Sequence, residues 1–102
     1  MNKSITIEPI HLNIVRSLLK KHLPSNIKVW VFGSRATGNI KNTSDLDLAL
    51  EDDKAIDNEV LIDLKEAFEY SDLPYKVDLI DMHKISETFK NIVNQQKIKL
   101  PF

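Results

Sequence analysis

The chain has 102 residues and a formal net charge of −1, with 42% hydrophobic and 28% charged residues but only two glycines and four prolines. This composition argues against a disordered chain, and the length suffices for one domain with one hydrophobic core. No basic cluster indicates binding to duplex nucleic acid, and the lack of cysteine excludes disulfides, zinc–thiolate sites and thiol nucleophiles.

The N-terminal residues predict neither a signal peptide nor a membrane anchor. Residues 1–4 lead into no uninterrupted apolar run. No apolar run in the sequence reaches the roughly 20 residues that cross a bilayer. We therefore expect a soluble, cytoplasmic protein that forms a single domain over residues 1–102.

The first half of the chain alternates between helical and strand patterns. Residues 8–22 carry apolar side chains at helical spacing, and Pro9 suits the first turn of a helix. Residues 27–32 are apolar and rich in β-branched and aromatic side chains, which predicts a short buried strand. Residues 34–37 are expected to open a short helix, and residues 38–44 form a polar loop.

The second half continues this alternation. Residues 46–50 and 76–80 predict strands, and residues 56–70 and 86–95 predict helices. The apolar tail, residues 98–102, either folds back onto the core or docks on a partner or a second copy. The order of elements predicts an α/β (α+β) fold in which a small mixed β-sheet is flanked by helices.

A Gly-Ser turn after the first strand is the first feature that carries chemistry. Gly33 permits close approach of a ligand to the backbone, and the hydroxyl of Ser34 can donate to a phosphate oxygen. Backbone N–H groups exposed at the start of a helix attract anions. The sequence therefore predicts a phosphate-binding turn.

Three acidic residues predict a metal site beside this turn. Alternation along a strand places Asp45 and Asp47 on one face, where two carboxylates repel each other unless a cation lies between them. Taken alone, this pair is explained equally well as solvated charges at a strand end. Asp78 interrupts an apolar strand and is the best third acid. Asp81 is an alternative, but it lies on the opposite face of that strand.

Together these residues resemble a known family. A hydrophobic-Gly-Ser pattern, about ten further residues, and Asp-hydrophobic-Asp-hydrophobic resemble the signature of the DNA polymerase β-like nucleotidyltransferases. Gly-Ser-Arg-Ala-Thr-Gly and Ser-Asp-Leu-Asp-Leu are similar to its minimal branch (MNT), the antitoxins of HEPN/MNT toxin–antitoxin pairs. The resemblance extends from the first predicted helix to the last and implies a polymerase β-like fold.

The resemblance also implies an activity and its residues. The enzyme would use two Mg²⁺ ions to transfer a nucleoside monophosphate, AMP if the substrate is ATP, to a hydroxyl of a helical HEPN-type protein. Gly33 and Ser34 would hold the triphosphate. Arg35 would either contact the outer phosphates or pair with an acid that fixes the loop, and the sequence favours neither. Catalysis and metal binding would fall to three acids: Asp45, Asp47 and Asp78.

Two other functions stay open at this point. The chain could be a binding module that neutralises its partner by contact alone, although three clustered carboxylates favour the enzyme. It could also transfer nucleotides to a small molecule, but no added substrate domain supports this alternative.

Overall fold

The structure, a computed structural model, describes residues 5–38 and 45–102. Its elements follow in the order α1 (Pro9–His22), β1 (Lys28–Phe32), α2 (Ser34–Thr37), β2 (Leu46–Glu51), α3 (Asn58–Glu69), β3 (Val77–Asp81), α4 (Glu87–Gln96) and β4 (Ile98–Lys99). Each predicted helix and strand is confirmed, with small shifts at its ends. The strand β4 is not among the predicted elements. The predicted polar loop falls mostly on residues 39–44, which lie outside the described residues.

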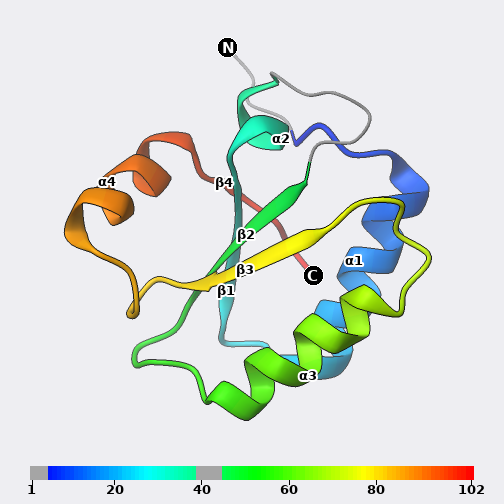
Figure 1. Cartoon of the computed structure of the whole chain (residues 1–102), viewed down its shortest axis with the longest axis horizontal. Helices are drawn as coiled ribbons and strands as arrows, with labels where there is room; N and C mark the ends of the chain where they lie inside the picture. Colours follow the sequence, from blue (N-terminus) through cyan, green and yellow to red (C-terminus); the bar gives the residue numbers. More distant parts are fainter. Residues whose placement is uncertain (1–4, 39–44) are drawn as a thin grey trace.

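The strands form one mixed sheet in the order β3-β2-β1-β4 (Figure 1). β1 is antiparallel to both of its neighbours, whereas β3 is parallel to β2 and reaches it through the crossover helix α3. The register places Phe32 opposite Asp47 and Asp47 opposite Asp78. The small mixed sheet flanked by helices is therefore confirmed.

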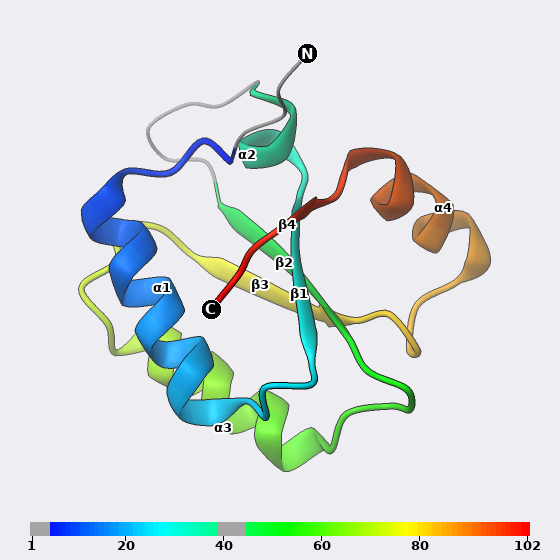
Figure 2. The same cartoon turned by 180° about the vertical axis from the view of Figure 1, so that it is seen from behind.

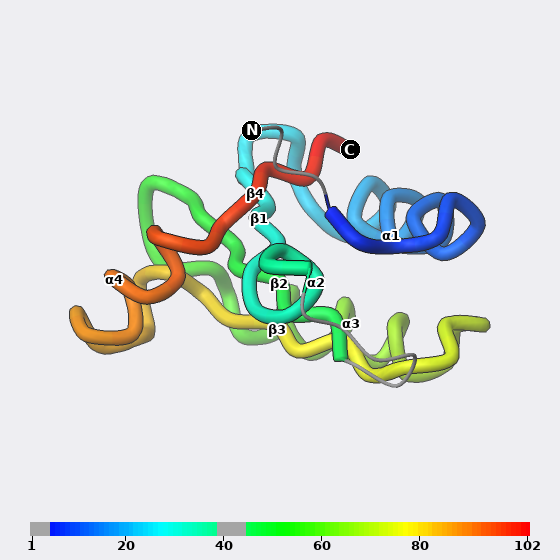
Figure 3. The backbone as a smooth tube through the Cα atoms, turned by 90° about the horizontal axis from the view of Figure 1, so that it is seen from above, coloured from blue at the N-terminus to red at the C-terminus, as the bar shows by residue number. Residues whose placement is uncertain are grey.

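Alternation along β2 separates the core from the acidic face. Leu46, Leu48 and Leu50 are fully buried in the cluster that α1 and α3 cover, and Ala49 lies in a second cluster with residues of α4. Figure 2 shows α1 and α3 next to each other, and Figure 3 shows α4 on the other side of the strands. Asp47 shares the face of Ala49, as period-2 alternation predicts.

Local signals in the sequence explain where the helices begin and end. Pro9 occupies the start of α1, where its missing N–H costs no hydrogen bond, and basic residues in the last turn complement the helix dipole. Ser86 caps α4 by accepting a hydrogen bond from the N–H of Phe89 at 3.2 Å. Within residues 5–38 and 45–102, no helix has the length and apolar character needed to cross a membrane.

The apolar tail folds back onto the core. Ile98 and Lys99 pair with β1, and the N–H of Leu100 donates to the carbonyl of Val29 at 2.9 Å. The side chain of Leu100 is 1% exposed, and Phe102 packs partly against the same core. In the structure the tail therefore adopts the first of the two predicted alternatives, folding back onto the core of its own chain.

Candidate active site

Two neighbouring strands bring the central acids together. Asp47 on β2 lies opposite Asp78 on β3 in the parallel register. Asp47 is half-buried, whereas Asp78 and Asp45 are exposed. Asp45 directly precedes β2 and acts on Asp47 through its charge. The three acids that the sequence singles out therefore lie at one end of β2 and on its neighbour.

This arrangement raises the pKa of Asp47 to about 6, compared with an ordinary value of 3.8. Burial is the largest cause, because it disfavours the charged form. The charges of Asp78 and Asp45 and a side-chain hydrogen bond with Asp78 raise the pKa further. A bound cation would relieve both the burial cost and the repulsion.

The Gly-Ser turn packs directly against Asp47. Gly33 has a backbone φ of 73° and ψ of −153°. A Cβ atom added there would overlap Oδ2 of Asp47 and lie 3.3 Å from its Cγ. Only glycine combines this backbone conformation with so close a contact. The first residue of the predicted phosphate turn therefore touches the central acid of the predicted metal site.

The turn is held from two sides. Its carbonyl side is fixed by α2, because the N–H groups of Ala36 and Thr37 donate to the carbonyl of Gly33 at 3.1 and 3.0 Å. Its N–H side is fixed by α4, because the N–H of Gly33 donates to Oε1 of Gln96 at 3.0 Å. Ser34 begins α2 and is half-buried next to Gly33. The two predicted phosphate-binding residues thus follow one another in an ordered turn.

Arg35 is 5% exposed and ties the turn to the rest of the fold. Its guanidinium lies 3.9 Å from the ring centroid of Tyr75, and its Nη1 donates to the carbonyl of Thr6 at 3.0 Å. These contacts fix the chain around α2. Neither of them is with an acid, so the pairing of Arg35 with an acid stays a prediction. The contact of Arg35 with phosphate stays a prediction.

Asp81 has a structural position that separates it from Asp78. Its side chain accepts hydrogen bonds from the N–H groups of Ile56 at 2.7 Å and His83 at 2.9 Å. Nζ of Lys84 lies 3.9 Å from its carboxylate. Asp81 is 3% exposed, so these contacts compensate the burial of its charge. It holds the segments after β2 and β3 together and does not face Asp47.

The acids suit a magnesium ion, which also binds substrate phosphates and water, better than a metal ion whose ligands all come from the protein. Among residues 5–38 and 45–102, no group of three His, Cys, Asp or Glu side chains is gathered so as to hold a metal ion. Mg²⁺ usually takes only one or two carboxylates and completes its shell with substrate phosphates and water. The Asp47–Asp78 pair beside a phosphate turn has this character.

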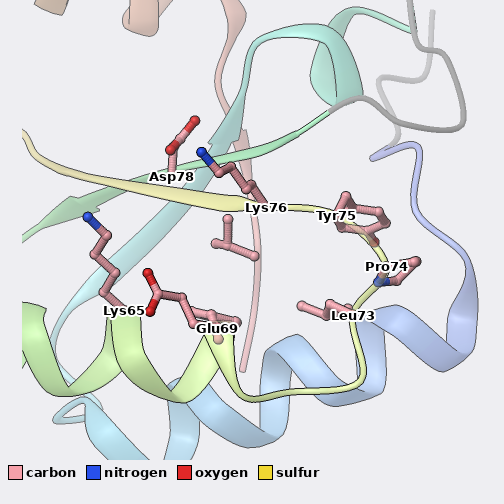
Figure 4. A pocket seen from close by; sticks show the side chains of 9 residues that line it. Lys65, Glu69, Leu73, Pro74, Tyr75, Lys76 and Asp78 are labelled. Atoms are coloured by element: carbon pink, nitrogen blue, oxygen red, sulfur yellow. The ribbon is translucent and has the colours of Figure 1, made fainter.

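Asp78 lies between two hollows in the surface. The first, of about 380 Å³, contains Asp47 and Asp78 and is bordered by Phe32 and Phe89. The second, of about 450 Å³, lies on the side of α3. In Figure 4, Lys65 and Glu69 point from α3 towards Asp78 on β3 and Lys76, which directly precedes β3. The second hollow has nine lining residues: Lys65, Phe68, Glu69, Leu73, Pro74, Tyr75, Lys76, Val77 and Asp78.

Comparison with known proteins identifies the family. The profile described as Polymerase beta, Nucleotidyltransferase matches residues 13–100, and the chain therefore belongs to this family of nucleotidyltransferases. The probable protein adenylyltransferase MntA of Haemophilus influenzae is 42% identical over 91 residues, which cover 89% of this chain and 79% of the relative. The expected enzyme class is thus confirmed, and a nucleoside triphosphate is the substrate that the family implies.

Solved structures share the fold. A crystal structure of a toxin–antitoxin with AMP-PNP has a TM-score of 0.72 and 28% identity, covering 87% of this chain and 71% of that chain. The complex of tri-AMPylated Shewanella oneidensis HEPN toxin with MNT antitoxin has a TM-score of 0.67 and 23% identity, covering 92% and 71%. At that identity the second likeness establishes the fold alone. The expected polymerase β-like fold is confirmed.

Removing the charge of Asp47 is expected to stabilise the metal-free protein at neutral pH. The pKa of Asp47 is raised from 3.8 to about 6 in the fold, so the folded state holds this proton more tightly than the unfolded chain. The stability linked to the proton is present below the unfolded pKa and is lost as the pH rises through the folded pKa. In EDTA, Asp47→Asn should have a higher Tm than wild type at about pH 7.5, and the difference should shrink as the pH falls towards the unfolded pKa of 3.8. Parallel Tm profiles across this range would contradict the expectation.

Proposed function

We propose that this chain, acting as one minimal nucleotidyltransferase domain, transfers AMP from ATP to a hydroxyl of a HEPN-type partner protein and so acts as the antitoxin of a toxin–antitoxin pair. The relative named a probable protein adenylyltransferase and the toxin–antitoxin structure with AMP-PNP support this assignment. The HEPN class of the partner is taken from the family resemblance. We assign the protein to the cytoplasm, where this reaction would have ATP and Mg²⁺ available.

The observation that carries the proposal is the contact between the phosphate turn and the acids. Gly33 packs against Asp47, and Asp47 lies opposite Asp78. A triphosphate held by Gly33 and Ser34 would therefore have its phosphates next to the carboxylates. Two Mg²⁺ ions held there would neutralise charge on the phosphates and polarise the attacking and leaving oxygens. The acids proposed to hold them are Asp45, Asp47 and Asp78.

We assign to Asp78 the role of acting on the acceptor. It lies in the hollow that contains Asp47 and also in the hollow beside α3, so it can contact groups that enter from either. We assign the α3 side to the acceptor, because a volume of about 450 Å³ accommodates an aromatic or aliphatic side chain that bears a hydroxyl. The Asp78 carboxylate, which is exposed, would accept the proton of that hydroxyl.

The step balances without an additional reactant. The acceptor oxygen forms a bond to the α-phosphorus of ATP while the bond from that phosphorus to the bridging oxygen breaks. The hydroxyl proton passes to Asp78, and pyrophosphate leaves with the electron pair of the broken bond. The product is an AMP phosphodiester on the partner protein.

Labelling of the partner tests this proposal. The chain and whatever HEPN-type protein is encoded beside it are incubated with Mg²⁺ and α-labelled ATP, with Asp45→Asn as the control. We expect label on the partner with wild type and a strong reduction with the variant. Equal labelling by both proteins would overturn the assignment. A tight complex without label, with full neutralisation by Asp45→Asn, would instead establish an antitoxin that acts by contact.

A further inference from the structure

The geometry points to Gln96, at the end of α4, as a residue that contacts the triphosphate. Its Oε1 accepts the hydrogen bond of the Gly33 N–H at 3.0 Å across 63 positions of the sequence. The inference rests on the proposed function, because it takes the turn at Gly33 and Ser34 to be the place where phosphates bind. It adds to that site a side chain from an element outside the Gly-Ser and Asp-x-Asp motifs.

The hydrogen bond fixes which end of the amide faces the turn. A backbone N–H is a donor, so the atom that meets it must be the carbonyl oxygen of Gln96. Nε2 is bonded to the same carbon and therefore also lies beside the turn. Within residues 5–38 and 45–102, this NH₂ group donates to no protein acceptor, and the residue is partly exposed. Two donor hydrogens are thus available next to Gly33.

The surroundings of Gln96 hold it in place. Val93, one turn earlier, is fully buried in the cluster beneath α4. Lys97, the next residue, lies with its Nζ 4.2 Å from the ring centroid of Trp30. Ile98 and Lys99 then pair with β1. Since both flanks of Gln96 are anchored, its amide is preorganised and little freedom is lost when it binds a ligand.

The chemistry of the amide suits an anion. The N–H of Gly33 is already bound to Gln96 and is not free to bind a phosphate oxygen unless the side chain moves. The NH₂ group of Gln96 replaces that donor with two others at the same place. Phosphate oxygens are strong acceptors, and hydrogen bonds to charged groups are stronger than those between neutral groups. Gln96 therefore holds the turn with its oxygen and the triphosphate with its nitrogen.

Three variants separate contact from support. Gln96→Ala removes both roles, whereas Gln96→Glu keeps an oxygen for the Gly33 N–H but puts a negative charge where the donor was. Gln95→Ala is the matched control, because Gln95 is the exposed neighbour on the same helix. The dissociation constant of AMP-PNP with Mg²⁺ is measured by calorimetry, and KM and kcat are measured for transfer.

We expect Gln96→Ala to weaken AMP-PNP binding by about tenfold, as for the loss of one hydrogen bond to a charged oxygen, and to raise KM more than it lowers kcat. Gln96→Glu should bind more weakly still, and Gln95→Ala should match wild type. If Gln96→Glu binds AMP-PNP as tightly as wild type, Gln96 only supports the turn and does not contact the triphosphate. If Gln96→Ala binds as tightly as wild type, Gln96 has neither role in binding. If wild type itself fails to bind AMP-PNP, the proposed function fails and the inference falls with it.

Discussion

Replacing Asp47 with asparagine is expected to lower kcat/KM for nucleotidyl transfer by at least about 100-fold, the loss typical of removing one group that stabilises charge in the transition state. Asparagine has nearly the shape of aspartate but no negative charge. Asp47 lies between Gly33 and Asp78, so the change acts where the phosphates and the metal ions would meet. Initial rates over a range of ATP and Mg²⁺ concentrations measure the loss.

A second neutral substitution separates the site from the overall charge. Asp63 is exposed on α3, and Asp63→Asn removes the same unit of charge away from β2. It should transfer at the wild-type rate. Asp47→Asn should also remain folded, because burial and the neighbouring acids disfavour the charge of Asp47, and the substitution removes that charge. Wild-type activity in Asp47→Asn would refute the assignment of this carboxylate to catalysis.

Replacing Gly33 with alanine is expected to reduce stability and activity together. The φ of 73° and ψ of −153° lie in a region that is nearly restricted to glycine, so the backbone alone costs about 1–3 kcal/mol. The added methyl group would also overlap Oδ2 of Asp47 and displace the carboxylate. A shift of about 1 Å in a reacting group can cost on the order of 100-fold in rate. Urea unfolding and kcat/KM report the two effects separately.

Gly38 supplies the matched control for this substitution. Its φ of 83° and ψ of 2° are also left-handed, and it ends α2. An added Cβ would meet no atom within 4 Å among the described residues. Gly38→Ala should therefore lose about 1–2 kcal/mol of stability through its backbone but keep its activity. An equal loss of activity in the two variants would show that the contact with Asp47 is not what matters.

The strands and helices follow from local patterns, and for this reason the sequence predicts them well. Leu46, Leu48 and Leu50 alternate with polar positions, and alternation by itself determines which side chains face the core. The strand β4 has only two residues and cannot show such a pattern. Its pairing depends on the free edge of β1, and the burial of Leu100 depends on the core that the other elements build. Neither the pairing of β4 nor the burial of Leu100 can therefore be predicted from the sequence of the tail alone.

The acids of the site could be predicted from the sequence, but the contacts that hold the surrounding segments in place could not. Asp78 and Asp81 lie an odd number of positions apart, so alternation assigns them to different faces, and the structure places Asp81 in a buried network of backbone N–H groups. The stacking of Arg35 on Tyr75 joins distant parts of the chain, and so does the hydrogen bond of Gln96. A glutamine in the polar last turn of a helix carries no signal of its own. Such contacts are properties of the assembled fold.

The position of β3 as an edge strand of the sheet also affects whether copies of the protein associate in concentrated solution. In the part of the chain that the structure describes, β3 pairs only with β2, so its outer side offers unpaired N–H and C=O groups to another molecule. Charged side chains on such a border discourage copies of a protein from joining strand to strand. Lys76 and Asp78, both exposed, supply these charges. The carboxylate proposed for chemistry thus also lies where a charge discourages strand-to-strand pairing between two copies.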